Sequence, residues 1–305
     1  MQFSIIGLGR MGTNLARQAL EKKHEVVGFD VHPAAVRALE SEGAAGVLSL
    51  QDLKQRLRAP RFVLIYVPHG KPTDETIRAL AETLQAGDIV MDGGNSHWRD
   101  AERHNAQLRS KGIGFLDVGT SGGLEGARHG ACFMAGGEPE HFKAVEPLLR
   151  SLAVPDGVVH AGPVGAGHFV KLIHNGIEFG MLQALGEGLD LLARSDYPLD
   201  LAAIFHNWAH GSVIRGWLVE LMEQGLRQTP LTELSSFVED TREVRWVVEY
   251  ALEKEAWIPV IAQSELALYR YREAESVAGK GVALLRHGFG GHPLHRKAAG
   301  EGRKK

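Results

Sequence analysis

Four polar side chains recur at helical spacing within an otherwise largely apolar stretch, residues 168–180, whose sequence is HFVKLIHNGIEFG. They stand at i, i+3, i+4 and i+7, which places them on one face of a helix, and they are Lys171, His174, Asn175 and Glu178. We expect the apolar remainder of this helix to face a core. Burying an amine, an imidazole, an amide and a carboxylate together costs free energy unless the groups pair or perform chemistry. The stripe is therefore interpreted as a reactive site, with a solvent-facing polar face as the alternative.

The outer pair of the stripe, Lys171 and Glu178, has the residue types needed by a reaction that uses a base and then an acid. A lysine that acts as a base must lose its proton near neutral pH, and lowering its pKa from about 10.4 to about 7 costs the charged form roughly 4–5 kcal/mol. Desolvation and a nearby positive charge lower the pKa of an amine, whereas a carboxylate such as that of Glu178 raises it. We predict that these two residues are the catalytic pair.

A glycine-rich turn, FSIIGLGRMGTNLA at residues 3–16, lies between a predicted strand and a predicted helix. Glycine there permits a tight turn and close backbone approach to a pyrophosphate, which the positive end of the helix attracts. The next predicted strand leads into Asp30, whose carboxylate can accept both ribose hydroxyls of NAD and repels the additional phosphate of NADP. We predict that the turn binds a dinucleotide, and the alternative is a glycine turn that serves packing alone. Of the two cofactors we predict NAD in preference to NADP. The predicted cofactor-binding residues are Gly7, Leu8, Gly9, Arg10, Met11, Gly12, Asp30, Val67, Pro68 and Asn95.

Two further segments are dense in glycine and polar residues, and each follows a predicted strand. They are DGGNS at residues 92–96 and GTSGG at residues 119–123. In a doubly wound sheet both turns lie at the carboxyl ends of strands, where ligands bind. Asn95 and Ser121 can donate to a hydroxyl or a carboxylate, and the glycines expose backbone N–H groups to an anion. Both segments, like the loop at residues 67–70, would also serve as simple turns, but we interpret the two glycine-dense segments as a substrate site.

The composition limits the class of protein. The 305 residues suffice for two domains with cores of their own, and 44% of them are hydrophobic and 23% charged. A net charge of −3 argues against nucleic acid as a main partner. The single cysteine, Cys132, excludes an internal disulfide and suits a reducing compartment. Because we find neither a leader segment nor an apolar run of membrane-spanning length, we expect a soluble cytoplasmic protein without a membrane partner.

The order of predicted elements indicates the fold class. Predicted strands cover residues 3–6, 25–29, 62–67, 88–91, 114–117, 132–135 and 158–160, and predicted helices lie between several of them, notably at 11–21 and 74–84. This alternation predicts an α/β domain with a doubly wound, mostly parallel, Rossmann-like sheet. After about residue 162 the chain is predicted to be all-α, with helices at 167–192, 201–209, 212–224, 241–254 and 259–277. We predict a cofactor domain at 1–163, a helical substrate and oligomerisation domain at 164–295, and a disordered basic tail at 296–305.

Five motifs in a fixed order resemble the decarboxylating 6-phosphogluconate dehydrogenases, which belong to the β-hydroxyacid dehydrogenase superfamily. These motifs are GLGRMG, DGGNS, TSGG, KLIHNGIE and a late FGGH, and the resemblance covers nearly the whole chain. KLIHNGIE together with DGGNS is far more specific than the glycine turn. The length of the chain suits the short-chain, NAD-preferring branch of that family.

The resemblance implies a reaction and its residues. Lys171 would take the proton of the C3 hydroxyl of 6-phosphogluconate as hydride passes to NAD, and would return a proton to the ketone oxygen as carbon dioxide leaves. Glu178 would protonate C1 of the enediol, giving ribulose 5-phosphate without a metal, because the ammonium of Lys171 stabilises the oxyanion. The implied substrate ligands are Asn95, Ser121, Gly122, Gly123, His174, Asn175, Arg245, Arg270, Arg286 and His292. In longer relatives the last two come from a partner subunit, which implies a homo-oligomer, a dimer or a tetramer.

The match departs from the family pattern near the implied phosphate site. Phe179 and Val247 stand where the family usually has a tyrosine and a threonine, and residues 241–244 replace a run that contains glycine. Each lost hydroxyl donor weakens phosphate binding by about 1 kcal/mol, unless Arg242 compensates. Two alternative functions therefore stay open: a β-hydroxyacid dehydrogenase for a small unphosphorylated acid, and a non-catalytic NAD-binding protein.

Overall fold

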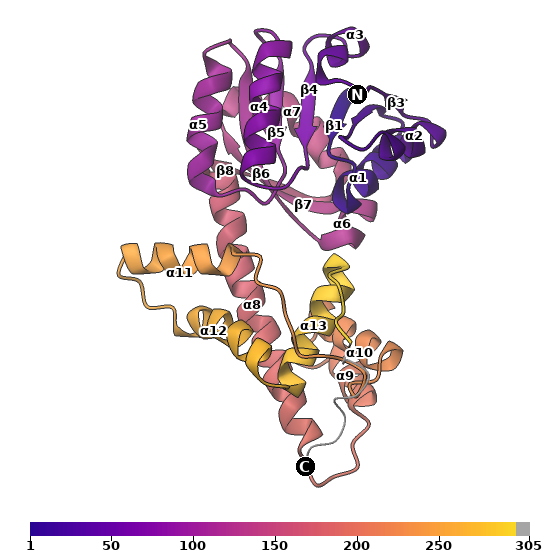
Figure 1. Cartoon of the computed structure of the whole chain (residues 1–305), viewed down its shortest axis with the longest axis vertical. Coiled ribbons are helices and arrows are strands. Elements are labelled where there is room, and N and C mark those ends of the chain that lie inside the picture. Colours follow the sequence, from indigo (N-terminus) through magenta and orange to yellow (C-terminus); the bar gives the residue numbers. More distant parts are fainter. Residues whose placement is uncertain (297–305) are drawn as a thin grey trace. The chain divides into compact units, whose positions relative to one another are not determined.

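A computed structural model of the chain describes residues 1–296 and separates into two compact units. The first unit is Met1–Lys171 and the second begins at Leu172, so the division falls within helix α8 (Ala166–Ala193) rather than at residue 163. Figure 1 shows the elements of both units along the chain. The predicted basic tail lies, apart from Arg296, outside the described residues.

The first unit is built on one eight-stranded sheet with the order β3-β2-β1-β4-β5-β6-β7-β8. Neighbouring strands are parallel except β6 and β7, which are antiparallel, so the sheet is mostly parallel as predicted. The strands are β1 (Gln2–Ile6), β2 (Glu25–Phe29), β3 (Ala45–Gly46), β4 (Phe62–Ile65), β5 (Ile89–Asp92), β6 (Gly114–Ser121), β7 (Ala131–Gly137) and β8 (Ala153–Gly162). The sequence did not predict β3, and β6 continues beyond its predicted end at residue 117.

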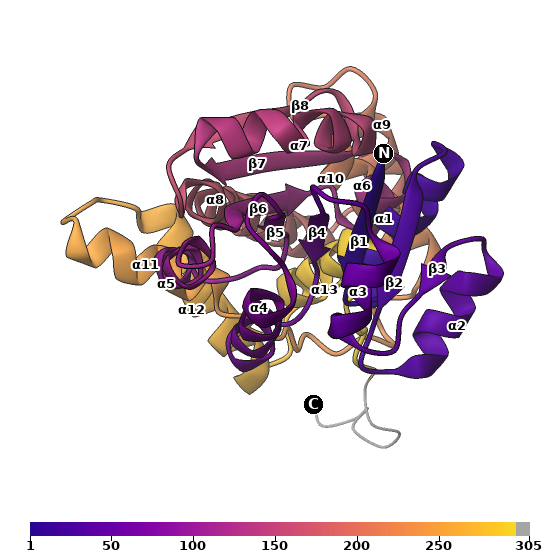
Figure 2. The ribbon, with the colours of Figure 1, turned by 90° about the horizontal axis from the view of Figure 1, so that it is seen from above.

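Helices cover both faces of this sheet (Figure 2), and the residues between sheet and helices form a separate apolar core on each face. One core packs the helices α1 (Arg10–Glu21), α2 (Pro33–Ser41), α6 (Gly123–His129) and α7 (Pro139–Leu152) against the strands. The other core packs the 3-10 helix η1 (Leu50–Asp52) with α3 (Leu53–Arg56), α4 (Lys71–Thr83) and α5 (Trp98–Arg109). Because both faces are covered, the strands in the middle of the sheet are mostly apolar.

Helices make up the second unit, as predicted, although their bounds differ. After α8 come α9 (Leu201–Ala209), α10 (Trp217–Gln228), α11 (Glu243–Glu253), α12 (Pro259–Glu273) and α13 (Val277–Gly290). The prediction of a helix at 212–224 was wrong at its start, and the one at 259–277 was too long, because Ser276 caps a separate helix. Glycine lowers helix propensity, and its frequency in α13 concealed this helix. The same glycines allow close packing, since a methyl group on Gly281 would lie 2.9 Å from Leu189.

The apolar face of α8 departs from expectation. Ile177, Met181 and Leu191 are exposed by 53%, 52% and 71%, whereas the stripe residue Asn175 is only 6% exposed. The expectation that the aliphatic residues of this helix face a core of the same chain was therefore wrong for this face. In the described residues no helix combines the length and the apolarity needed to cross a membrane.

Candidate active site

The glycine turn has the geometry that a dinucleotide requires. A methyl group on Gly7 would lie 2.3 Å from the carbonyl oxygen of Tyr66, and one on Gly12 would lie 1.9 Å from that of Gly7, so neither position accommodates a side chain. Gly9, in contrast, faces open space and precedes the first residue of α1 without a side-chain cap. Gly9 therefore provides no side-chain cap for the N–H groups of the first turn of α1. N–H groups at the start of a helix suit a bound pyrophosphate.

Asp30 lies directly after β2, beside the glycine turn. Its carboxylate accepts hydrogen bonds from the backbone N–H of Leu8 at 2.7 Å and from that of His32 at 2.8 Å. These two bonds fix the carboxylate at the turn, and an ionised carboxylate can accept further bonds from ribose hydroxyls. The arrangement fits the sequence prediction for NAD, and a phosphate at the same place would meet a negative charge.

A second carboxylate, that of Asp117 in β6, holds the beginning of α8. It is fully buried, and it accepts hydrogen bonds from the N–H groups of Gly165 and His168, both at 2.7 Å. A carboxylate at the first turn of a helix satisfies N–H groups that have no partner within the helix and complements the helix dipole. Lys171 follows His168 by about one helical turn, so its backbone is fixed from the sheet.

The side chain of His168 extends this network to the DGGNS segment. His168 is 3% exposed, and its Nε2 lies 3.0 Å from the carbonyl oxygen of Asp92, the last residue of β5. The carboxylate of Asp92 in turn accepts hydrogen bonds from the N–H of Gly94 at 3.0 Å and from the hydroxyl of Ser96 at 2.8 Å. Since Asp92 and Asp117 are neighbours in the sheet, two buried aspartates connect the DGGNS segment with the start of α8.

Lys171 lies against β6. A methyl group on Gly119 would be 2.4 Å from the Cβ of Lys171 and 2.8 Å from the carbonyl oxygen of Gly167, so the glycine is required by the helix. Ser121 stands on the same strand two residues further along, and therefore on the same face as Gly119. The prediction that GTSGG follows a strand was wrong for its first three residues, which belong to β6.

The remaining predicted residues of the first unit lie at the carboxyl ends of the central strands. Gly122 and Gly123 turn the chain from β6 into α6 with positive φ angles of 111° and 59°. Asn95 is exposed in the loop after β5, and Val67 and Pro68 follow β4. A methyl group on Gly94 would lie 3.0 Å from the carbonyl oxygen of Val67, so these two segments touch. Strand ends of a parallel sheet thus bring together the residues predicted for cofactor and substrate.

In the second unit, α8 carries the rest of the stripe. Nδ1 of His174 lies 3.7 Å from the carboxylate of Glu178, and the two side chains are 39% and 19% exposed. Glu178 also lies close enough to Arg286 for its charge to act on the guanidinium. Burial lowers the pKa of Arg286 below its ordinary value, and the carboxylates of Glu243 and Glu178 oppose this shift. The carboxylate of the predicted acid therefore shares its surroundings with one of the predicted phosphate ligands.

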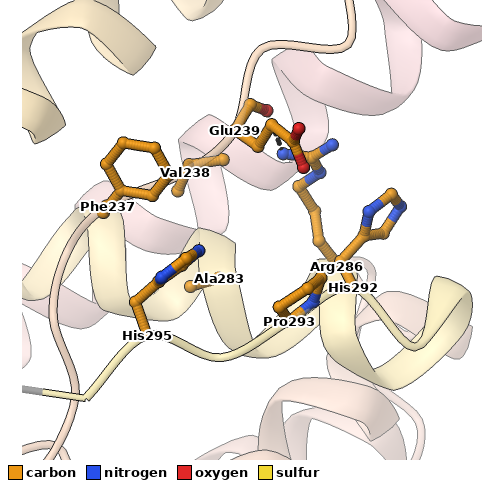
Figure 3. A pocket seen from close by; sticks show the side chains of 8 residues that line it. All are labelled: Phe237, Val238, Glu239, Ala283, Arg286, His292, Pro293 and His295. Carbon is orange, nitrogen blue, oxygen red and sulfur yellow. Dashed lines mark hydrogen bonds between the residues drawn. The ribbon is translucent and has the colours of Figure 1, made fainter.

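Arg286 and His292 line one pocket of about 260 Å³, which includes space open to solvent (Figure 3). The guanidinium of Arg286 is held within its own chain. It donates to the carbonyl oxygen of Glu239 and, at 3.4 Å, to the hydroxyl of Thr241, and it lies 5.2 Å from the centre of the Phe179 ring. Arg286 and His292 thus lie together on one chain, and the implication of the resemblance that such a pair serves the site of a partner subunit stays a prediction.

Arg245 and Arg270, the other two predicted phosphate ligands, are exposed residues of α11 and α12. Arg245 lies 3.8 Å from Glu249, and Arg270 lies 4.0 Å from Glu273. Long exposed side chains of this kind can reorient at little cost, because surface ion pairs contribute little free energy. Within residues 1–296, no group of three or more histidine, cysteine, aspartate or glutamate side chains could hold a metal ion.

Sequence reasoning missed the residues that support the site. Asp117 and His168 belong to this group, and so does Tyr66, whose hydroxyl lies 2.7 Å from that of Thr120. One signal was present in the sequence, because Asp92 and Asp117 are single charged residues within apolar strands. A charge in a buried strand needs partners, and it therefore indicates a hydrogen-bonded network.

Comparison with known proteins agrees with this geometry. The family profile described as the NAD binding domain of 6-phosphogluconate dehydrogenase matches residues 2–162, and that of the C-terminal domain of the same enzyme matches residues 167–264. Among solved structures, 6-phosphogluconate dehydrogenase of Plasmodium falciparum superposes with a TM-score of 0.81 at 22% identity, over 95% of this chain and 70% of that one. A 3-hydroxyisobutyrate dehydrogenase of Salmonella typhimurium gives a TM-score of 0.76 at 23% identity, over 92% of this chain and 99% of that one. At these identities the two structures establish the fold alone.

Curated relatives extend the match in sequence. The chain is 43% identical to the Bacillus subtilis protein YqeC, provisionally named a 6-phosphogluconate dehydrogenase, over 97% of this chain and 100% of that one. It is 38% identical to the NAD(+)-dependent, decarboxylating 6-phosphogluconate dehydrogenase of Haloferax volcanii, over 97% of this chain and 99% of that one. The chain belongs to the 6-phosphogluconate dehydrogenase family.

Proposed function

We propose that this protein oxidises and decarboxylates 6-phosphogluconate to ribulose 5-phosphate and carbon dioxide, with NAD as the oxidant. The observation that carries the proposal is the anchoring of α8, which bears the stripe Lys171, His174, Asn175 and Glu178, on the strand ends next to the glycine turn. The names of the two full-length relatives support the reaction.

In the proposed reaction Lys171 accepts the proton of the C3 hydroxyl while the hydride leaves C3. When NAD is bound, its nicotinamide ring supplies the acceptor for that hydride. Lys171 then donates a proton to the ketone oxygen as the C1 carboxylate departs as carbon dioxide, and its ammonium stabilises the negative charge that develops there. Glu178 protonates C1 of the enediol, so one base and one acid on the same helix face serve two successive steps.

The residues of the two substrate segments are proposed to orient the sugar acid. Ser121 and the turn Gly122–Gly123 offer a hydroxyl and N–H groups to the carboxylate, and Asn95, His174 and Asn175 offer donors and acceptors to the hydroxyls. At the far end, Arg245, Arg270, Arg286 and His292 are proposed to bind the phosphate. Bidentate guanidinium contacts suit phosphate oxygens, and cations compensate the doubly charged group.

A steady-state assay with 6-phosphogluconate tests the proposal directly. We expect NADH and carbon dioxide in equal amounts, and a higher kcat/KM with NAD than with NADP. Lys171→Ala should lower kcat by a factor of about 10²–10⁴ while leaving the dissociation constant of NAD unchanged. Lys71→Ala is the control, because the Lys71 side chain is 85% exposed on α4. Parallel loss of turnover and NAD binding in Lys171→Ala would contradict the role given to the amine.

One observation favours a second candidate, a β-hydroxyacid dehydrogenase for a small unphosphorylated acid. Arg286 is engaged by Glu239 and Thr241 of its own chain, and Phe179 offers no hydroxyl to a phosphate. Oxidation of a three- or four-carbon hydroxy acid without carbon dioxide release, and no turnover of 6-phosphogluconate, would select this candidate. NAD binding without turnover of any acid would instead indicate a non-catalytic protein.

We further propose that the chain functions as a homo-oligomer. The support is the exposed apolar face of α8, where Val170, Ile177, Met181 and Leu191 are all more than a third exposed. Contiguous exposed apolar surface on a helix is typical of an interface between subunits. Ile177→Glu should shift the mass measured by light scattering toward the monomer, and Leu48→Glu, at a 71% exposed position of the first unit, should not. Equal masses for both variants and the unaltered protein would contradict this interface.

A further inference from the structure

Tyr66 follows β4 and supports the glycine turn with its backbone. Its N–H donates to the carbonyl oxygen of Ile6 at 2.7 Å, and its own carbonyl oxygen lies where a side chain on Gly7 would be. Any displacement of the Tyr66 backbone therefore changes the surface against which Gly7 of the predicted pyrophosphate turn packs.

The ring of Tyr66 packs against the DGGNS segment. A methyl group on Gly93 would lie 2.6 Å from Cζ of Tyr66 and 2.9 Å from its hydroxyl oxygen. The first glycine of DGGNS is thus explained by the phenol ring, which occupies the space that a side chain would need. Asn95 follows two residues later, so the ring limits where this loop can lie.

The hydroxyl of Tyr66 reaches the GTSGG segment, where it lies 2.7 Å from Oγ1 of Thr120. Thr120 is the penultimate residue of β6, between Gly119 and Ser121. One face of β6 carries Gly119 and Ser121, and Gly119 lies against Lys171 on that face. Side chains alternate along a strand, so Thr120 points to the opposite face. The end of β6 is consequently held from both faces, by α8 at Gly119 and by Tyr66 at Thr120.

We propose that Tyr66 is a positioning residue for the substrate site: its hydroxyl fixes Thr120, and through it Ser121, while its ring fixes the loop that carries Asn95. One side chain thereby sets the spacing of both substrate segments relative to the glycine turn. The phenol does not act as an acid or a base, because burial raises its pKa well above the ordinary value and keeps it protonated. The effect on turnover rests on the proposed function, whereas the hydrogen bond itself does not.

Kinetics of Tyr66→Phe and Thr120→Val test the proposal, because each variant removes one hydroxyl and keeps the shape of the side chain. Each should raise the KM for 6-phosphogluconate about fivefold, the effect of one part-buried neutral hydrogen bond, and change kcat by less than about twofold. Thr120→Val also removes a longer hydrogen bond, of 3.4 Å, from the Thr120 hydroxyl to the carbonyl oxygen of Val118, so the double variant should be no worse than Thr120→Val alone. The dissociation constant of NAD should not change. Tyr197→Phe, at a 75% exposed position, is the matched control.

A measurement without substrate separates this proposal from the proposed function. In Tyr66→Phe the amide hydrogens of residues 119–123 should exchange with solvent faster than in the unaltered protein, and in Tyr197→Phe they should not. Unchanged exchange, additive effects in the double variant, or a large loss of kcat without a change in KM would each overturn the positioning role. If the unaltered protein does not turn over 6-phosphogluconate, the proposed function fails, and the exchange rates still decide whether Tyr66 holds β6.

Discussion

Gly119→Ala tests the dependence of catalysis on the contact between β6 and α8. The added methyl group would lie 2.4 Å from the Cβ of Lys171 and 2.8 Å from the carbonyl oxygen of Gly167. Neither atom can turn away by a change of rotamer, because one is a Cβ and the other is backbone. The first turn of α8 must therefore move off the strand, although Asp117 holds it with two hydrogen bonds of 2.7 Å.

The size of the effect follows from the distances. Carbon atoms in contact are about 3.5–4.0 Å apart, so relief of the overlap requires a displacement of about 1 Å or more at Lys171. A reacting group misplaced by about 1 Å can lose about 100-fold in rate. We expect kcat with 6-phosphogluconate to fall by about this factor, while the glycine turn and Asp30, which lie elsewhere in the sheet, keep their affinity for NAD.

Steady-state kinetics, NAD titration by tryptophan fluorescence and thermal unfolding should be measured on the same preparations. Gly188→Ala is the matched control, because it adds the same methyl group to α8 where nothing lies within 4 Å. We expect it to leave kcat unchanged and to stabilise the helix slightly. If Gly119→Ala kept kcat within about threefold of the unaltered protein, the position of Lys171 would not govern catalysis, and its role as the base would be refuted. A folded Gly119→Ala protein that had lost NAD affinity as well would show that the displacement is not local to Lys171.

Two further changes probe the cofactor site and the helical unit. Asp30→Asn should lower the ratio of kcat/KM with NAD to that with NADP by about tenfold or more, because it removes a charged acceptor; an unchanged ratio in assays with both cofactors would exclude Asp30 as the selective residue. Burial raises the pKa of Glu265 above its usual value of 4.5, so the neutral carboxyl favours folding at low pH and this contribution is lost as the pH rises through the folded-state pKa. Glu265→Gln should therefore gain stability relative to the unaltered protein in urea unfolding as the pH rises above the ordinary pKa of the carboxyl, and a constant or falling difference would contradict the assigned burial effect.

Local patterns predicted much of the fold. The predicted strand at 25–29 and the predicted helix at 201–209 coincide with β2 and α9, because each is an apolar run bounded by turn residues or a helix cap. The stripe on α8 was also predictable from local sequence, because residues spaced by three or four positions lie on one face of a single helix. The start of β8 was harder to predict from the sequence. Its residues Pro155, Asp156 and Gly157 have the composition of a turn, and Asp156 has a positive φ of 60°. The strand nevertheless continues through a shift in its register with β7.

The support of the candidate site could not be predicted, because it depends on pairs that are distant in the sequence. Asp117 binds the N–H groups of residues 165 and 168, and His168 reaches back to Asp92. The periodicity of the sequence does not predict such pairs, because they form only when the strand order brings β5, β6 and the start of α8 together. The types of the reactive residues follow from local sequence, whereas their positions follow from the tertiary fold.

Two of the departures from the family pattern, Phe179 and the run at residues 241–244, contact one guanidinium, that of Arg286. Phe179, which replaces a tyrosine, lies beneath Arg286, and Thr241, from the replaced run before α11, accepts a hydrogen bond from the same side chain. At these two places the chain has a cation–π contact and a hydrogen bond within the chain. The hydrogen bonds of Asp117 and the close contact of Gly119 that fix the start of α8 and Lys171 involve none of these positions. If the proposed function holds, we expect the chain to retain the proposed chemistry at Lys171 and to differ from its relatives in how it binds the phosphate end of the substrate.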